Sequence, residues 1–404
     1  MGEAVQVSGF SAADPDAVWA VVGNFCAPWH PLIATMTAEP HQTRAFTVRG
    51  EDTVYRERLT YRSASDRTLH YTHIAGIAGA QRYDASLTVT AHGTGSQITM
   101  AAEIEAAAPR AAQIAEGTRA IFQIGLDALA ATLTPLILPG APRLALTVTP
   151  PKPGPLCLFL HGIGGARGNW DAQLAAVAPV MRAAALDLRG YGDSTLGSDQ
   201  STVDAYCADI LRIADHLGAD KLVLVGLSYG AWLASSFAMR HPDRLAGLVL
   251  SGGCTGMSEA GPDERAAFRQ SRETPLNAGQ TPADFAPAVV NVIAGPQATA
   301  ETRARLLQSM QAIPSATYRD ALTCFTTPPE RFDFAKLTMP VLMMTGEHDR
   351  LAPPAEIRGV AQRIAANPGA NVRFETIPNA GHVCNIENPT AYNHPLLAFL
   401  QALT

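Results

Sequence analysis

The sequence of 404 residues is poor in charge and in lysine. Only 16% of the residues are charged and the formal net charge is −6. Three of the basic residues are lysines (Lys152, Lys221 and Lys336), and the arginines form no run or cluster. The basic patch of a nucleic-acid-binding protein is therefore missing from the sequence.

The sequence also lacks an uninterrupted apolar run of the length that a membrane span needs. The most apolar candidate, residues 222–239, is broken by glycines and serines, which is typical of a buried strand followed by a helix. The first residues contain Glu3 where a secretory signal needs positive charge. We therefore expect a protein that does not act in a membrane.

Cysteine is scarce and no metal motif is present. The six cysteines are widely separated, with no C-x-x-C pair, and there is no H-E-x-x-H sequence. This pattern predicts free thiols in a reducing compartment, the cytoplasm, and neither a metal nor a cofactor. We expect the activity to survive chelators.

Nearly half of the residues (47%) are hydrophobic, which predicts a globular protein, and the length predicts two or three domains. Residues 1–134 combine a strand, a short helix, clear strands at 54–61, 68–73, 83–89 and 96–103, and a long helix at 107–132. Prolines and glycines predict a linker at 135–143. From 144 to 404, buried strands alternate with helices, except at about 254–339, where a helical cap is expected.

The order of elements in the first unit, together with residues 22–31 (VGNFCAPWHP), resembles polyketide cyclase/dehydrase-like members of the START and Bet v 1 superfamily. The resemblance implies an α+β helix-grip domain, in which a curved antiparallel sheet wraps around a long helix. Such domains often enclose an apolar cavity, so a ligand-holding role is implied by analogy.

A G-x-S-x-G motif in the second unit is the main functional feature. It spans residues 226–230, directly after the apolar run 221–225 and before a helical stretch. A serine on such a sharp strand-to-helix turn is lifted out of the sheet, and the flanking glycines remove side chains that would collide there. This placement predicts Ser228 as a nucleophile.

Candidates for the other catalytic groups follow at the ends of later strands. Asp349 comes after a strand at 340–344 and His382 after the last strand, so that the order is Ser, Asp, His. Glu347 is the alternative to Asp349 as the acid. The amides of Ile163, after the strand at 156–160, and Tyr229 are the predicted oxyanion donors.

Two further residues, Gly162 and Trp170, are candidates for the substrate-binding site. Trp170, together with Asn169, either lines the acyl pocket or only begins a helix. His161 is predicted to hold the oxyanion loop and not to carry a proton.

These motifs together give a second resemblance, over residues 144–404. They include His161-Gly162, residues 187–194 (DLRGYGDS), the G-x-S-x-G motif at 226–230, residues 346–349 (GEHD), and Gly381-His382 followed by Glu387 and Pro389. The unit looks like an α/β-hydrolase of the lactonase and carboxylesterase type, similar to 3-oxoadipate enol-lactonases. The resemblance implies a doubly wound, mostly parallel sheet with a helical cap, and a triad of Ser228, His382 and Asp349.

The leading hypothesis is a cofactor-independent serine hydrolase that opens an ester or lactone of a small to medium hydrophobic substrate through an acyl-enzyme. Two alternatives stay open: a C–C bond hydrolase or cofactor-free haloperoxidase on the same fold, and a non-catalytic ligand receptor. The expected partner is a small molecule. The exact substrate, the role of the first domain, a ligand shared between the domains and homo-oligomer formation are left open.

Overall fold

The computed structural model describes residues 2–11, 15–92, 95–130, 134–328 and 332–403. The chain divides into two compact units, residues 1–134 and 135–404. Each unit has its own hydrophobic core.

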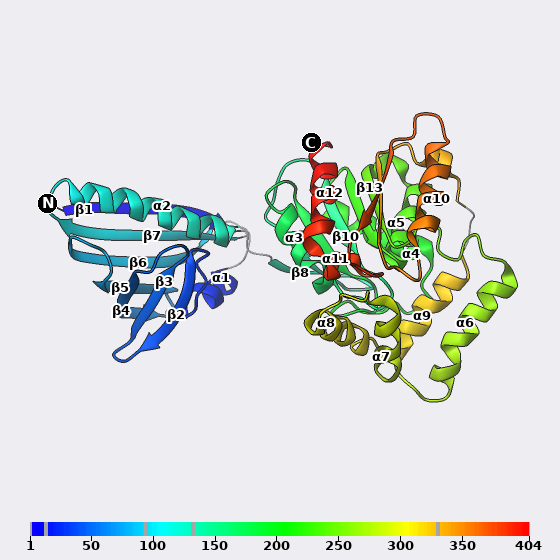
Figure 1. Ribbon diagram of the computed structural model, residues 1–404, viewed down its shortest axis with the longest axis horizontal. Coiled ribbons are helices and arrows are strands. Elements are labelled where there is room, and N and C mark those ends of the chain that lie inside the picture. The colour runs from blue at the N-terminus through cyan, green and yellow to red at the C-terminus, as the bar shows by residue number, and fades with distance from the viewer. Residues whose placement is uncertain (1, 12–14, 93–94, 131–133, 329–331, 404) are drawn as a thin grey trace. The chain divides into compact units, whose positions relative to one another are not determined.

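The first unit is an antiparallel sheet of seven strands with one long helix (Figure 1). The sheet order is β1-β7-β6-β5-β4-β3-β2. The strands are β1 (Gly2–Ser11), β2 (Ile33–Glu39), β3 (Thr43–Val48), β4 (Val54–Ser63), β5 (Thr68–Ala75), β6 (Ala80–His92) and β7 (Gly95–Ala106), and the helices are α1 (Pro15–Val22) and α2 (Arg110–Ala130).

Alternating burial explains how this sheet holds its helix. At 83–89 of β6 and 96–106 of β7 every second residue is buried, as a strand with one core face requires. Helix α2 contributes buried residues such as Phe122 and Leu126 to the same core. The clear strands predicted from the sequence are present, and β2 and β3 add two that were not singled out. The long helix begins at Arg110 instead of 107, and positions 131–132 of the prediction lie outside the described residues.

The second unit is built on a sheet of eight strands in the order β15-β14-β13-β12-β10-β11-β9-β8. The strands are β8 (Thr134–Leu138), β9 (Leu144–Val148), β10 (Leu156–Leu160), β11 (Ala183–Asp187), β12 (Leu222–Leu227), β13 (Leu245–Ser251), β14 (Val341–Gly346) and β15 (Val372–Ile377). From β11 to β15 neighbouring strands are parallel, while β9 pairs with β11 in the antiparallel sense.

The segment 135–143, predicted as a linker, differs from that expectation. Its first half belongs to β8, the edge strand beside β9. Leu138 is buried in the core of the second unit and Leu136 packs against it. Prolines are tolerated on an edge strand because one side of its ladder is unpaired, so the proline-rich composition did not exclude a strand.

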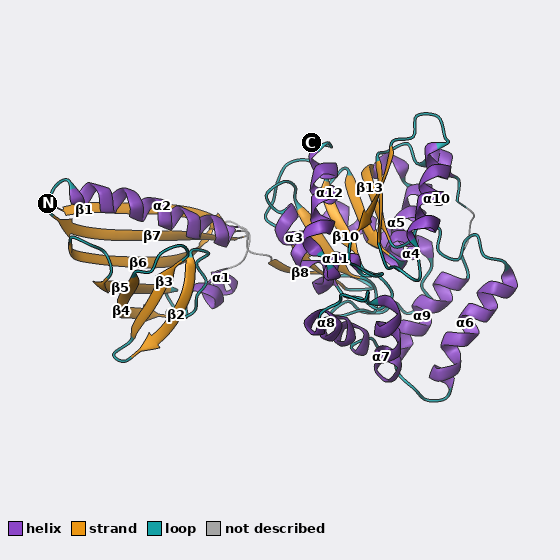
Figure 2. Ribbon diagram, in the orientation of Figure 1, coloured by secondary structure: helices purple, strands orange, loops and turns teal. Residues whose placement is uncertain are grey.

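Helices cover both faces of this sheet, with α3 and α12 on one face and α4, α5 and α10 on the other (Figure 2). Helices α6 to α9 form the insertion between β13 and β14, in the region where a cap was predicted. The helical elements are η1 (Arg167–Trp170), α3 (Asp171–Val177), α4 (Val203–His216), α5 (Tyr229–Arg240), η2 (Pro242–Arg244), α6 (Pro262–Asn277), α7 (Pro282–Ile293), α8 (Ala300–Gln311), α9 (Ser315–Thr326), η3 (Phe334–Lys336), α10 (Pro354–Ala365), α11 (Cys384–Glu387) and α12 (Pro389–Gln401).

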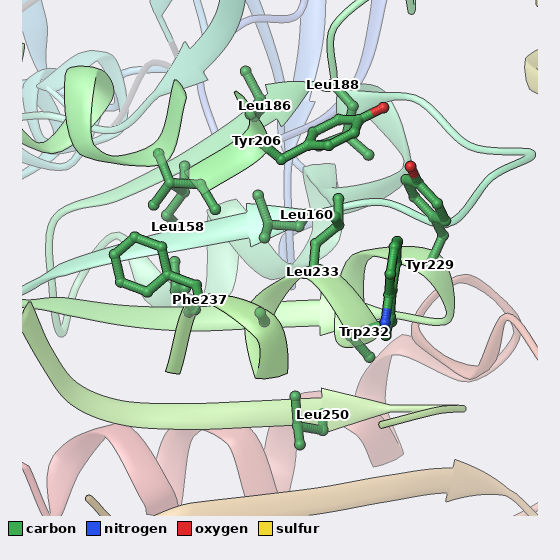
Figure 3. Packing of buried hydrophobic residues seen from close by; sticks show 14 of the residues in the cluster. Leu158, Leu160, Leu186, Leu188, Tyr206, Tyr229, Trp232, Leu233, Phe237 and Leu250 are labelled. Carbon is green, nitrogen blue, oxygen red and sulfur yellow. The ribbon is translucent and has the colours of Figure 1, made fainter. Parts of the chain in front are cut away.

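The centre of the unit is α5, which is buried along almost its whole length. Leu233 and Phe237 of α5 lie against Leu158 and Leu160 of β10 (Figure 3). Strands covered on both faces need continuous apolar sequence, and β10 and β12 are buried at every position. The rigid sheet and helix fix the turn that joins β12 to α5.

None of the helices in the part of the chain that is described is both long and apolar enough to cross a bilayer.

Candidate active site

Ser228 occupies the turn between β12 and α5 in a backbone conformation that is rare for a residue with a side chain. Its φ is 54° and its ψ is −112°, and its amide donates to the carbonyl of Ser251 at 2.8 Å. A Cβ on Gly226 would overlap the carbonyl of Gly230, and one on Gly230 would overlap the carbonyl of Leu160. The two glycines are therefore required by close backbone approach, as the motif predicted.

Asp349 and His382 are in direct contact. Oδ2 of Asp349 lies 2.9 Å from Nδ1 of His382, and both side chains are buried. Because the carboxylate is the acceptor, Nδ1 carries the proton and Nε2 is left as the basic atom.

Asp349 is held firmly in this position. Its Oδ1 accepts the amides of Leu351 and Ala352 at 2.8 and 2.9 Å. Burial by itself would raise the pKa of Asp349, but the hydrogen bond and charge of His382 and the two amides outweigh it, so that the pKa lies below its ordinary value. The carboxylate is therefore ionised at neutral pH.

Glu347, the alternative acid, has a different environment. Its carboxylate accepts the amide of Asn379 at 3.0 Å and lies 3.8 Å from Nε2 of His348. Half of its side chain is exposed. The structure thus pairs His382 with Asp349 and leaves Glu347 at the surface.

Ser228 and His382 line one cavity of about 600 Å³, together with Gly162, Ile163 and Tyr229. The Gly252–Gly253 segment after β13 lies close to Ser228, His382 and Asp349. A Cβ on Gly252 would lie 3.2 Å from the His382 ring and 3.3 Å from Oδ2 of Asp349, and one on Gly253 would lie 3.3 Å from the carbonyl oxygen of Ser228. The three candidate catalytic residues therefore surround the same short stretch of backbone.

His161 fixes the peptide group that carries the Ile163 amide. Its Nδ1 lies 2.7 Å from the carbonyl oxygen of Gly162, and its Nε2 accepts the amide of Leu188 at 3.1 Å. The ring must then be neutral with the proton on Nδ1. In a trans peptide the N–H points opposite to the C=O. Because His161 holds the Gly162 carbonyl, the Ile163 N–H points away from the His161 ring.

The second predicted donor, Tyr229, is the first residue of α5, so its amide has no acceptor within the helix. The positive end of the helix dipole adds to the effect of this amide on a developing negative charge. The tyrosine ring itself is buried and contacts Trp232 and Phe325.

The two predicted substrate-binding residues both line the cavity. A Cβ on Gly162 would lie 3.4 Å from Cβ of Ser228, so this glycine borders the candidate nucleophile. Trp170 ends η1, is 1% exposed and contacts Phe159 and Tyr392. It is therefore both a core residue and part of the cavity wall.

One contact with the cap was not predicted from the sequence. The amide of His382 donates to the carbonyl of Ile293 at the end of α7, at 2.8 Å. The carboxylate of Glu387 accepts the amides of Gly381 at 3.0 Å and of Gly295 at 2.7 Å. Glu387 therefore ties the loop of the candidate base to the cap. Its spacing of five residues from His382 was visible in the sequence, but its partner Gly295 is distant along the chain.

No group of three or more histidine, cysteine, aspartate or glutamate side chains in the described ranges has the geometry of a metal site.

Comparison with known proteins gives two family matches. Residues 155–389 match a family model described as the alpha/beta hydrolase fold, and residues 3–134 match one described as polyketide cyclase/dehydrase and lipid transport.

The curated relatives that match this chain include one from Pseudomonas putida and one from Cronobacter turicensis. The acetyltransferase component of the acetoin cleaving system of Pseudomonas putida is 27% identical over 251 residues, which cover 60% of this chain and 63% of that protein. The chain thus spans less than two thirds of the length of this relative. A protein named as a carbamate hydrolase in Cronobacter turicensis is 26% identical over 263 residues, which cover 63% of this chain and 94% of that protein.

Solved structures give the same result. An esterase from Thermogutta terrifontis has a TM-score of 0.58 and 26% identity, covering 68% of this chain and 99% of its own. The enol-lactonase from Burkholderia xenovorans has a TM-score of 0.53 and 23% identity, covering 64% of this chain and 96% of its own. At that identity the second likeness concerns the fold alone.

Proposed function

The chain belongs to the α/β-hydrolase family through residues 155–389 and carries a polyketide cyclase-like domain at 3–134, and we propose that it is a serine hydrolase that cleaves an ester or lactone. The observation that carries the proposal is the contact between Asp349 and His382 at the wall of the cavity that Ser228 also lines. The esterase similarity, at 26% identity, supports the same reaction class.

In the proposed first step, Oγ of Ser228 attacks the carbonyl carbon of the substrate and its proton passes to Nε2 of His382. Asp349 keeps the ring in the required tautomer and stabilises the imidazolium that forms. The negative oxygen of the tetrahedral intermediate faces the amides of Ile163 and Tyr229. One such donor is typically worth about 10²- to 10³-fold in rate.

Collapse of this intermediate breaks the bond to the leaving oxygen, which takes the proton from His382, and leaves an acyl group on Ser228. Water then repeats the sequence with His382 as base, and Ser228 leaves as the protonated alcohol. In a lactone the leaving oxygen stays attached to the acyl group, so a single hydroxy acid is released.

The lining of the cavity supports a predominantly apolar substrate. Phe268, Phe285 and Phe325 border it, together with several aliphatic side chains. A volume of about 600 Å³ lies within the range of pockets that take small to medium organic molecules.

The proposal is tested with a fluorophosphonate probe, which phosphonylates an activated serine. We expect one labelled site in the wild type, at Ser228, and none in Ser228→Ala. Ser236→Ala, which changes a buried serine of α5 away from the turn, is the matched control and should label fully. Labelling at another serine, or 4-nitrophenyl ester hydrolysis that persists in Ser228→Ala, would disprove the assignment.

A further inference from the structure

The cap places a cation, Arg272, on the wall of a mostly apolar cavity. Arg272 lies on α6 and lines the cavity along with Phe268, one turn earlier on the same helix. A guanidinium group stays charged in any protein environment. A charged group on the wall of a mostly apolar cavity is costly unless an anion or a hydrogen-bond acceptor binds it.

Ring contacts connect Arg272 to the nucleophile turn. Tyr229, the neighbour of Ser228, contacts Phe325 at a centroid distance of 5.8 Å, and Phe325 contacts Phe268 at 5.9 Å. Cζ of Arg272 lies 3.6 Å from the centroid of the Phe268 ring. Two aromatic rings thus separate the guanidinium from the residue next to Ser228, so that one molecule of moderate length along this wall would reach both ends.

Within the described part of the chain, no carboxylate pairs with Arg272. Its protein hydrogen bonds both use Nη1, to Oγ of Ser271 at 2.7 Å and to the carbonyl of Phe268 at 3.5 Å. Burial lowers the pKa of Arg272. Because the hydrogen bonds of Arg272 within the described residues use Nη1, its Nε and Nη2 can donate to a ligand.

Arg269, on the same helix, shows the ordinary alternative. Its Nε lies 2.8 Å from the carboxylate of Glu273 in an i,i+4 pair, and it is not a cavity residue. The charged side chain that shares the cavity wall with Arg272 is Glu356, which is exposed on α10 and makes no ion pair with it. Among the residues that the structure describes, no carboxylate thus compensates the positive charge of Arg272.

We propose that Arg272 binds a carboxylate on the substrate, at the end remote from the bond that Ser228 cleaves. This inference rests on the proposed hydrolase function. A single planar guanidinium with a free edge matches a carboxylate in both geometry and charge, whereas a phosphate dianion would need a second cation. The substrate class is therefore an ester or lactone with an apolar body and a terminal carboxylate.

Two pairs of esters of matched shape test this. Mono(4-nitrophenyl) adipate is compared with 4-nitrophenyl hexanoate, so that a carboxylate replaces a methyl group on the acyl side. 4-Carboxyphenyl butyrate is compared with 4-carbamoylphenyl butyrate, which places the charge on the alcohol side. In at least one pair we expect kcat/KM of the wild type to favour the anionic ester by about tenfold or more, the effect of a charged hydrogen bond.

Arg272→Gln should remove this preference while hydrolysing the neutral esters within about threefold of the wild type, which also shows that the variant is folded. Arg272→Lys should keep part of the preference, since it retains the charge but not the fork. Arg269→Gln is the matched control and should keep all of it.

Two failures are distinguishable. If Ser228 is labelled by the fluorophosphonate but neither pair shows a preference for the anion, or if Arg272→Gln slows both members of a pair equally, the role of Arg272 is wrong and the hydrolase stands. If Ser228 is not labelled, the proposed function itself fails.

Discussion

Strain at Ser228 should be measurable as stability that a glycine restores. With φ at 54° and ψ at −112°, the residue sits in a region that costs a side-chain-bearing residue about 1–3 kcal/mol. Ser228→Ala keeps the Cβ and therefore the strain, whereas Ser228→Gly removes it. Glycine also gains about 0.4–1 kcal/mol of backbone entropy in the unfolded chain, which acts against it.

The balance predicts that Ser228→Gly is more stable than Ser228→Ala by about 1–2 kcal/mol, which corresponds to about 2–8 °C in Tm for a unit of this size. Calorimetry of the full chain measures the transition of residues 135–404. Both variants should be inactive, so activity does not enter the comparison.

A matched pair on α5 should give the opposite sign. Ser236 is fully buried within the helix, where glycine is about 1 kcal/mol worse than alanine. Ser236→Gly should therefore melt below Ser236→Ala. If Ser228→Gly also proves equal to or less stable than Ser228→Ala, the turn stores no strain and the reasoning from its dihedral angles is wrong.

Three further predictions concern the groups around Ser228. Asp349→Asn should lower kcat by about 10⁴-fold with little change in KM, because the wrong tautomer of His382 is favoured. Glu347→Gln should keep kcat within about twofold of the wild type. The reverse pattern in steady-state kinetics would make Glu347 the acid. Glu387→Gln should lower kcat at least tenfold per titrated active site, because an amide nitrogen would face one of the two N–H groups that now donate to the carboxylate. Unchanged kcat with a lower Tm would show that Glu387 has only a structural role. Glu375→Gln on β15 is the control. Burial lowers the pKa of His161 below its ordinary value of 6.5, so the unfolded chain binds this proton first and the free energy of unfolding should fall as the pH drops from 6.5 towards the folded pKa. Urea unfolding at several pH values should show a weaker pH dependence in His161→Gln. Burial also lowers the pKa values of His30 and His73, which therefore contribute the same trend from the first unit.

The candidate nucleophile was predictable because its evidence is local. A strand, a glycine-flanked serine and a helix follow each other within about twenty residues, and the backbone of the turn is determined by those same residues. The placement of the candidate Ser, Asp and His at strand ends was predictable for a related reason, since parallel strands bring their carboxyl ends to one edge whatever lies between them.

The choice between Asp349 and Glu347 was not local. The two residues lie two positions apart after the same strand. Apart from the family resemblance, the sequence gives no reason to prefer one of them as the acid. The turn after β14 decides between them, because it directs Asp349 towards His382 and towards two amides, and leaves Glu347 with Asn379 at the surface.

The edge strand shows the same limit in the fold. The prolines around 135–142 predicted a linker, and only contact with the core of the second unit makes 134–138 a strand. Edge pairing is a long-range event that composition does not record.

Sequence patterns were enough to predict two units, the doubly wound sheet and the identity of the candidate nucleophile, since periodicity and turn chemistry act between neighbours in the chain. Packing of the folded chain determined which acid contacts His382, that Glu387 links the loop of this candidate base to the cap, and that Arg272 lies on the cavity wall with no carboxylate partner among the described residues. Those facts depend on distances between residues far apart in sequence, and such distances are set by packing.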